Sequence, residues 1–197
     1  MFTAKDVMTL RQRTGAGMME AKKALEENKG DMDKAAEFLR VKGIAKADKR
    51  SGKQTSEGVI TSYIHHNGKV GVLVEVNCET DFVARTDDFK NLAKEIALHI
   101  ASAAPVSVDK EGVPAERVEQ ERRIAEEQAK ESGKPANIIE KMVQGKVDKY
   151  YKENCLLQQG WIREPNKSIA DLIKEASAKV GENIQVRRFV RFQMGEE

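Results

Sequence analysis

The segment CETDFVAR, residues 78–85, places a thiol, two carboxylates, a hydroxyl and a phenyl ring directly after a run of alternating valines. Cys78 could act as a nucleophile, with His65 or His66 as the base and Asp81 orienting that base. However, a single cysteine at the end of a valine-rich strand is usually a small buried apolar residue. No sequence signature of a nucleophile family surrounds it. A thiol hydrolase therefore stays an alternative, and we expect no catalytic residue and no enzyme.

Metal and phosphate sites have little support from the residue types. His65 and His66 are adjacent in a predicted strand and point to opposite faces, so both cannot readily bind one ion together with Cys78 and Asp81. The stretch GAGMM lacks the preceding strand and the GK[ST] ending of a phosphate-binding loop. We therefore expect no metal, no cofactor and no direct nucleotide binding.

The C-terminal stretch RRFVRF could bind RNA, because it interleaves basic and aromatic side chains that could hold phosphates and stack on bases. The residues are Arg187, Arg188, Phe189, Arg191 and Phe192. The other interpretation is a strand with one buried face and one basic, solvated face. RNA binding therefore stays an alternative function.

The overall charge favours neither nucleic acid nor an anionic membrane as a partner. Lys and Arg number 34, Asp and Glu 32, and the formal net charge is +2. No apolar run approaches the roughly 20 residues that span a bilayer, and the N-terminus lacks the pattern of a signal peptide. We expect a cytoplasmic protein whose two cysteines are reduced thiols.

The first part of the chain predicts a small three-helix module. Apolar residues recur at helical spacing over residues 3–13, 17–28 and 32–42, and Thr3 and Asp31 are suitable caps. Gly15, Gly30 and Gly43 are expected to end these helices. The polar stretch KRSGKQTSEG then resembles a linker. We predict a three-helix domain over residues 1–50 and an α+β core domain over residues 51–197.

The period changes to two after the predicted linker. Strands are expected over 58–66 and 70–77, joined at Asn67-Gly68, with a closing strand over 183–192. Core helices are expected near residues 89–100, 138–151 and 169–180, and residues 114–133 predict a charged helix that is exposed to solvent. The predicted fold class is α+β, an antiparallel sheet packed with helices.

Two pairs of residues suit contact with another protein. Met18 and Met19 are adjacent at a helix start, so we expect one to be buried and the other to be exposed, although the pattern does not show which. Asp81 and Phe82 follow a strand directly, where a loop would carry both outward. Phe82 could instead staple the following helix by a hydrophobic contact.

Several stretches together resemble bacterial elongation factor Ts, in its short form. They are LRQRTGAGMMEAKKALEENKGDMDKAAEFLR, EGVI, NCETDFVAR and GENIQVRRFVRF, and the resemblance runs from residue 5 to the C-terminus. TGAGMM and TDFV are its most specific motifs. The resemblance implies that the N-terminal module is similar to a ubiquitin-associated domain.

The resemblance further implies a guanine nucleotide exchange factor that promotes GDP release from elongation factor Tu. Two groups of partner-binding residues are expected, namely Leu10, Arg11, Met18 and Met19 on the module, and Thr80, Asp81, Phe82 and Val83 after the strand. Asp81 and Phe82 would be inserted beside the magnesium and phosphate site of the partner. No phosphoryl group would be transferred.

The short form implies two chains acting together, in a possible homodimer that forms a 2:2 complex with the GTPase. One short relative type is cross-linked through a cysteine at the position of Val190, so a disulfide is not expected here. Longer members of the family carry a duplicated core and a protruding coiled coil, and we expect both to be absent at this length.

Overall fold

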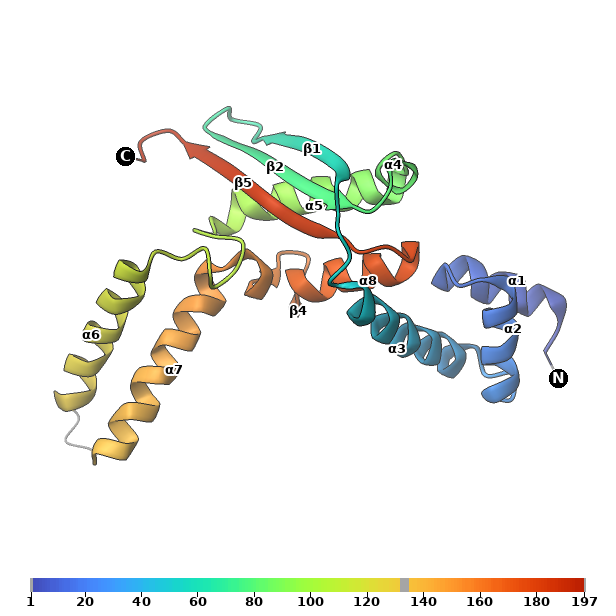
Figure 1. Cartoon of the computed structure of the whole chain (residues 1–197), viewed down its shortest axis with the longest axis horizontal. Helices are drawn as coiled ribbons and strands as arrows, with labels where there is room; N and C mark the ends of the chain where they lie inside the picture. The colour runs from blue at the N-terminus through green and yellow to red at the C-terminus, as the bar shows by residue number, and fades with distance from the viewer. Residues whose placement is uncertain (1, 132–134, 197) are drawn as a thin grey trace. The chain divides into compact units, whose positions relative to one another are not determined.

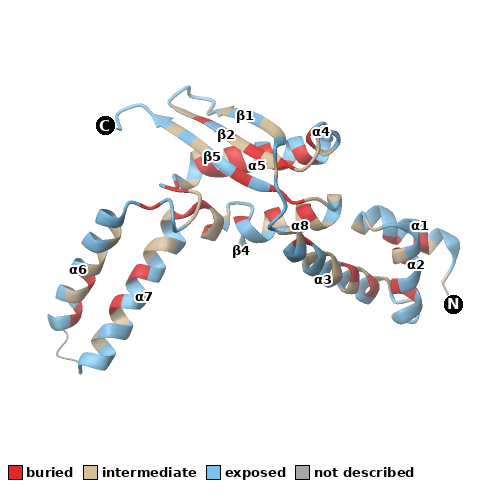
Figure 2. Cartoon of the chain, in the orientation of Figure 1, coloured by how far each residue is buried: buried red, intermediate tan, exposed pale blue. Residues whose placement is uncertain are grey.

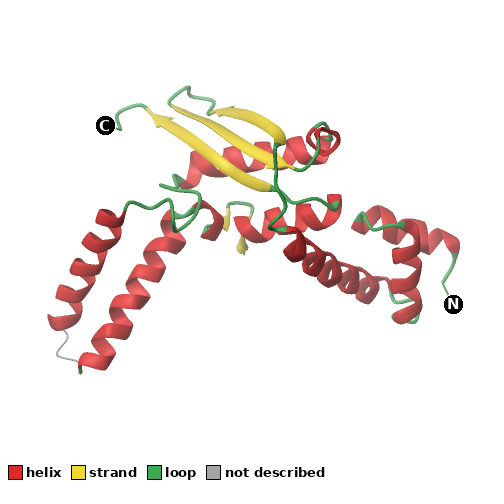
Figure 3. Cartoon of the chain, viewed as in Figure 1, coloured by secondary structure: helices red, strands yellow, loops and turns green. Residues whose placement is uncertain are grey.

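A three-stranded antiparallel sheet and a series of helices form the fold, which confirms the α+β class (Figures 1 and 3). The computed structural model describes residues 2–131 and 135–196. Contacts divide the chain into two compact units. Unit 1 contains Met1–Ile60, Glu75–Ala93 and Asp171–Val186, whereas unit 2 contains Thr61–Val74, Lys94–Ala170 and Arg187–Glu197. The boundary at residue 50 therefore stays a prediction.

The first three helices are α1 (Ala4–Thr14), α2 (Met18–Glu27) and α3 (Met32–Arg50). Thr3 caps α1 in a capping box with Asp6, and the Asp31 side chain accepts hydrogen bonds from two backbone amides at the start of α3. Gly15 ends α1 with a positive φ of 71°. These start and stop positions agree with the expectations from sequence.

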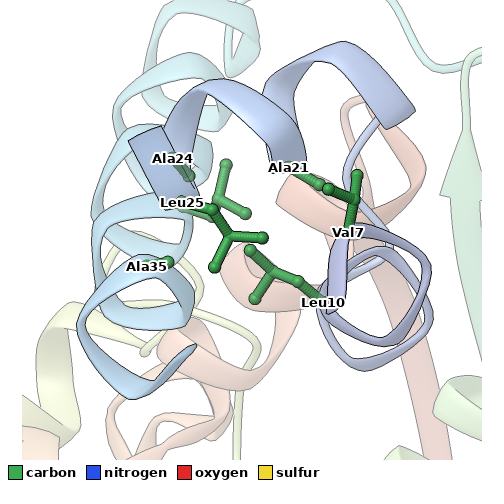
Figure 4. Close-up of a cluster of buried hydrophobic side chains, with 7 residues drawn as sticks. Val7, Leu10, Ala21, Ala24, Leu25 and Ala35 are labelled. Atoms are coloured by element: carbon green, nitrogen blue, oxygen red, sulfur yellow. The ribbon is translucent and has the colours of Figure 1, made fainter. Parts of the chain in front are cut away.

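The module core is small and rich in alanine, so the helices approach one another closely. Its side chains gather between the three helices in Figure 4, and the buried members are Val7, Leu10, Ala21, Ala24, Leu25, Ala35 and Leu39. Each helix alone is too short to be stable in water, so the module depends on this shared core.

Helix α3 is longer than expected, because it continues through Gly43 to Arg50. Gly43 does not end the helix, contrary to the expectation from its place after the last periodic residue. A Cβ atom at this position would lie 3.1 Å from the Cβ of Ala178 on α8 (Ile169–Val180), so the glycine instead allows close helix packing. The predicted linker consequently loses its first two residues to the helix.

The sheet has the strand order β1-β2-β5, from β1 (Glu57–Ile64), β2 (Val70–Cys78) and β5 (Gln185–Gln193). The expected turn at Asn67-Gly68 is present, since His65 N donates to Val70 O and Gly68 has a φ of 69°. Helix α5 (Asp87–Ala103) lies along one face of the sheet (Figure 1). The even-numbered residues of β2 from Val72 to Cys78 are buried, as alternation predicts.

Helices α6 (Ala115–Glu131) and α7 (Ala136–Asn154) pack against each other, and Figure 2 shows buried positions on both. Ala125, Ala129 and Val143 form their shared cluster. The expected solvated helix is therefore half of a helix pair, and α7 is not the core helix that its spacing suggested. Small alanines among charged residues concealed this contact.

The one-turn helix α4 (Asp81–Ala84) follows β2, and α7 leads into the 3₁₀ turn η1 (Leu156–Gln158). The short strands β3 (Gly160–Trp161) and β4 (Glu164–Ser168) then pair in antiparallel fashion. This two-stranded sheet was not expected from sequence, because strands so short show no periodicity.

His99 on α5 is fully buried in a polar network of unit 2. Its Nε2 lies 3.0 Å from Gln159 Oε1, and Ile162 N donates to its Nδ1 over 3.3 Å. Gln159 Nε2 in turn donates to the carbonyl oxygens of Ala103 and Glu153. The neutral ring with hydrogen on Nε2 satisfies every partner, whereas a proton on Nδ1 would face a donor. Burial lowers the pKa of His99 below its ordinary value of 6.5.

This network predicts a loss of stability in acid. Below pH 6.5 the unfolded chain takes up a proton at His99 that the folded chain does not, so the free energy of unfolding falls with pH. The decline from this group is at most about 1.4 kcal/mol per pH unit. In His99→Gln the decline between about pH 7 and about pH 5 should become flatter, as measured by urea unfolding across that range.

His66→Gln is the matched control, because His66 is exposed and should leave the wild-type slope in place. An equally steep decline in His99→Gln and in the wild type would show that the buried ring is not the group responsible.

Candidate functional site

The segment that carries Asp81 and Phe82 begins where β2 ends, at Cys78. Thr80 is the N-cap of α4 with an extended backbone, and its Oγ1 accepts from Val83 N over 3.4 Å. β2 is therefore followed, after Glu79 and Thr80, by a single helical turn that begins with Asp81 and Phe82.

Phe82 is 79% exposed at the tip of this segment, which we call the 80–83 loop. A staple contact with the following helix is therefore absent, and that alternative was wrong. Asp81 is half-buried and forms an ion pair of 2.8 Å with Arg85, four residues along. Val83 is also half-buried. The loop thus presents a ring and a carboxylate side by side.

A carboxylate from the far end of the sequence holds the base of this loop. Glu182 Oε2 accepts from the backbone N–H groups of Glu79 and Thr80, each over 3.1 Å. Glu182 Oε1 accepts from Thr80 Oγ1 over 2.6 Å. Three donors of one short segment therefore converge on a single side chain.

A second carboxylate ties the same segment to α3. Arg50 binds Glu79 with two hydrogen bonds, of 3.1 and 2.7 Å, and Asn183 N donates to Glu79 Oε1 over 2.7 Å. The hydrogen bond from Arg50, with that from Asn183, lowers the pKa of Glu79. Sequence reasoning missed Arg50, Glu79, Glu182 and Asn183, because their partners lie far away along the chain. The charged and amide residues directly after Gly181 were the available indication.

Cys78 is fully buried beneath the loop, and its Sγ lies 3.2 Å from Thr80 O. Burial, with the negative charge of Glu182 nearby, raises the pKa of the thiol to about 11. A buried thiol that stays protonated at neutral pH is a poor nucleophile. This contradicts the thiol-hydrolase alternative. Cys155 is likewise free and buried.

The N-terminal residues expected to bind a partner fall into two groups. Arg11, Met18 and Met19 are exposed, the two methionines by 45% and 74%. Leu10 instead has no exposed surface and belongs to the module core. The expectation that one methionine of the pair is buried was wrong, because alanines and Leu25 further along α2 fill the core.

The remaining candidates do not form a site in the described residues. His65 accepts or donates a hydrogen bond with Tyr63 over 3.0 Å, and no group of three metal-ligating side chains occurs in residues 2–131 and 135–196. The side chain of Arg191 is only 12% exposed and binds Ala101 O, Gln193 and Glu196. Arg191 is therefore held by partners within the chain, so the RNA-binding alternative loses one of the arginines expected to contact phosphate.

None of the helices within the described ranges combines the length and the apolar character that crossing a bilayer requires.

Comparison with known proteins gives one consistent result. The family model for elongation factor TS matches residues 3–196. The elongation factor Ts of Fervidobacterium nodosum is 58% identical over 195 residues, which is 99% of each chain. That of Thermosipho melanesiensis is 56% identical over the whole of both chains, and that of Carboxydothermus hydrogenoformans is 56% identical over all of this chain and 90% of its own.

Proposed function

Because the chain belongs to the elongation factor Ts family, we propose that it is the translation elongation factor that promotes release of GDP from elongation factor Tu. Nucleotide exchange makes and breaks no covalent bond, so the site needs contact surfaces and no nucleophile. The observation that carries the proposal is the exposed ring of Phe82 beside the half-buried carboxylate of Asp81, on a segment whose base is held by hydrogen bonds to Glu182. Since the reaction belongs to translation, the cytoplasm is the proposed location.

Exchange is a case of reciprocal coupling between two ligands of the GTPase. A partner that prefers the nucleotide-free state weakens GDP binding by the same factor by which GDP weakens binding of the partner. Each tenfold loss of GDP affinity requires about 1.4 kcal/mol of differential contact. The exchange factor must therefore make contacts that are available only when the nucleotide site is disturbed.

The Asp81-Phe82 tip suits such a disturbance at a magnesium and phosphate site. The bound ion is the largest local charge that holds the phosphates, so displacing the groups around it weakens GDP binding. The ring of Phe82 is exposed, and its burial against the partner would lower the free energy of the complex. Asp81 carries a negative charge into a site of negative phosphates, and its exposed pair with Arg85 costs little to break.

The N-terminal module is the proposed docking element. Arg11, Met18 and Met19 are exposed near the turn between α1 and α2, and methionine adapts its shape to a partner surface. Leu10 would contribute from the core, by holding α1 in place. We retain residues 1–50 as a separate docking domain, with residues 51–197 as the core domain.

A homodimer is the proposed assembly, and the outer face of the sheet supports it. Within unit 2, Ile64 lies against Gly71, which shares a strand face with the exposed Leu73. On β5, Arg191 points to α5, so Val190 and Phe192 point to the opposite face. Phe192 is 68% exposed. An apolar sheet face of this kind suits pairing with a second copy and hence a 2:2 complex.

The loop proposal predicts a specific kinetic result. Asp81→Ala and Phe82→Ala should each slow release of fluorescent GDP from elongation factor Tu by about tenfold, because each removes a contact made at the disturbed site. The double variant should be slower than either, but by less than the product of the two effects, since both act at one place. Stopped-flow fluorescence gives the rates.

Three further variants make the comparison specific. Cys78→Ala should exchange nearly as the wild type, as should Glu164→Ala and Ile138→Ala, which remove an exposed carboxylate and an exposed apolar side chain elsewhere. If the Asp81→Ala/Phe82→Ala double variant releases GDP from elongation factor Tu at the wild-type rate, the loop proposal is wrong.

The dimer proposal predicts that Val190→Glu/Phe192→Glu is monomeric, because like charges would meet across the apolar face. Sedimentation equilibrium at about 10 μM measures the mass of the wild type and the variant. Ile138→Glu places a charge on α7 and should leave the dimer intact. A monomeric wild type, or a double variant that remains dimeric, would contradict the proposal.

A further inference from the structure

We propose that Glu182 is a positioning residue for exchange, which fixes the orientation of Asp81 and Phe82 through the backbone and hydroxyl group of Thr80. The inference rests on the proposed exchange function of the 80–83 loop. Glu182 itself lies in the turn after α8 and would touch neither the nucleotide nor the magnesium ion.

The chemistry of the contact matches an ionised carboxylate. Two N–H groups and one O–H group point at Glu182, and a carboxylate is the side chain that only accepts. Hydrogen bonds to a charged acceptor are about twice as strong as neutral ones. The short contact of 2.6 Å to Thr80 Oγ1 is typical of such a bond.

The Thr80 hydroxyl links Glu182 to the exposed tip. Because the hydroxyl hydrogen is directed at Glu182, the lone pairs of Thr80 Oγ1 are free to accept from Val83 N. That bond caps α4, whose first turn carries Asp81 and Phe82. Without Glu182 the hydroxyl can rotate towards other acceptors, and the cap of a four-residue helix loses its fixed geometry.

Glu182 is itself held in place, so it can act as a fixed support. Gly181 before it adopts a left-handed φ of 76°, which ends α8 and turns the chain. The side chain of Asn183 after it donates to Ser51 O and Lys53 O, and Asn183 N donates to Glu79. The two segments therefore bind reciprocally, because each carboxylate accepts a backbone N–H of the other segment.

Glu182→Gln is the most informative substitution, because it keeps the shape and removes the charge. Either orientation of the amide places an NH₂ group where one or more of the three donors now points. The maximal rate of GDP release should fall by about tenfold, which corresponds to the loss of one charge-assisted hydrogen bond of about 1.4 kcal/mol. The concentration for half-maximal rate should change little, because the docking surface of the module is untouched. Glu164→Gln is the control for a lost exposed carboxylate.

A double-mutant cycle separates positioning from general stability. If Glu182 acts through the tip, Glu182→Gln should have almost no further effect in the Asp81→Ala/Phe82→Ala background. A loss of the same size in both backgrounds would overturn the positioning role. Thr80→Val breaks the same link from its other side, and serves as the test variant if Glu182→Gln does not fold.

A measurement without the GTPase keeps this inference distinct from the proposed function. Hydrogen exchange at the Val83 and Thr80 amides of the isolated protein should be faster in Glu182→Gln, whereas the amides of α5 should exchange at the wild-type rate. Unchanged protection of the Val83 amide would overturn the inference, whatever the rate of nucleotide exchange. If the wild type fails to accelerate GDP release from elongation factor Tu while the Val83 amide loses protection in the variant, the proposed function is wrong, and with it any role of Glu182 in nucleotide exchange.

Discussion

A helix of four residues is not stable by itself in water, so the orientation of Asp81 and Phe82 must be set by other parts of the chain. The sheet provides the start of the segment, at the end of β2. The turn after α8 provides the acceptor for three of its donors. Much of the remaining α+β core in unit 1 can be understood as the framework that brings these two segments together.

The second requirement is a link between the loop and the docking module. Arg50, the last residue of α3, holds Glu79 with two hydrogen bonds directly beside the loop. Arg50 and Glu79 are both partly shielded from water, so this pair is stronger than an ordinary surface ion pair. The module, in turn, has a core in which alanines form much of the contact, and it therefore depends on close helix packing. Docking residues and loop are thus connected through α3.

Local chemistry was predictable from sequence where the interacting residues are neighbours in the chain. Thr3, Asp31 and Asn67-Gly68 marked caps and a turn correctly, because each acts within a few residues. The alternating valines of β2 likewise indicated its buried face. Asp81 and Phe82 were predicted to contact another protein because they directly follow a strand. The family resemblance then indicated which partner they would contact.

The errors share a different physical origin, since each involved contacts between distant segments. Gly43 was taken for a helix stop, although it serves close packing against Ala178. Ala125 and Ala129 carry too little apolar character to reveal the α6–α7 contact. Glu182 looked like an ordinary charged residue after a helix. No local sequence pattern indicates that the hydrogen-bond partners of Glu182 lie about 100 positions earlier in the chain, at residues 79 and 80.

The central claim is that Asp81 and Phe82 accelerate GDP release by disturbing the magnesium site of elongation factor Tu. Its most direct test compares the wild type with Asp81→Ala/Phe82→Ala in GDP release at saturating magnesium and again with the magnesium removed by a chelator. If the tip acts through the ion, GDP release should be much faster with the wild type than with the double variant when magnesium is present. The two proteins should give similar rates when magnesium is absent. An equal ratio of rates under both conditions would contradict the account.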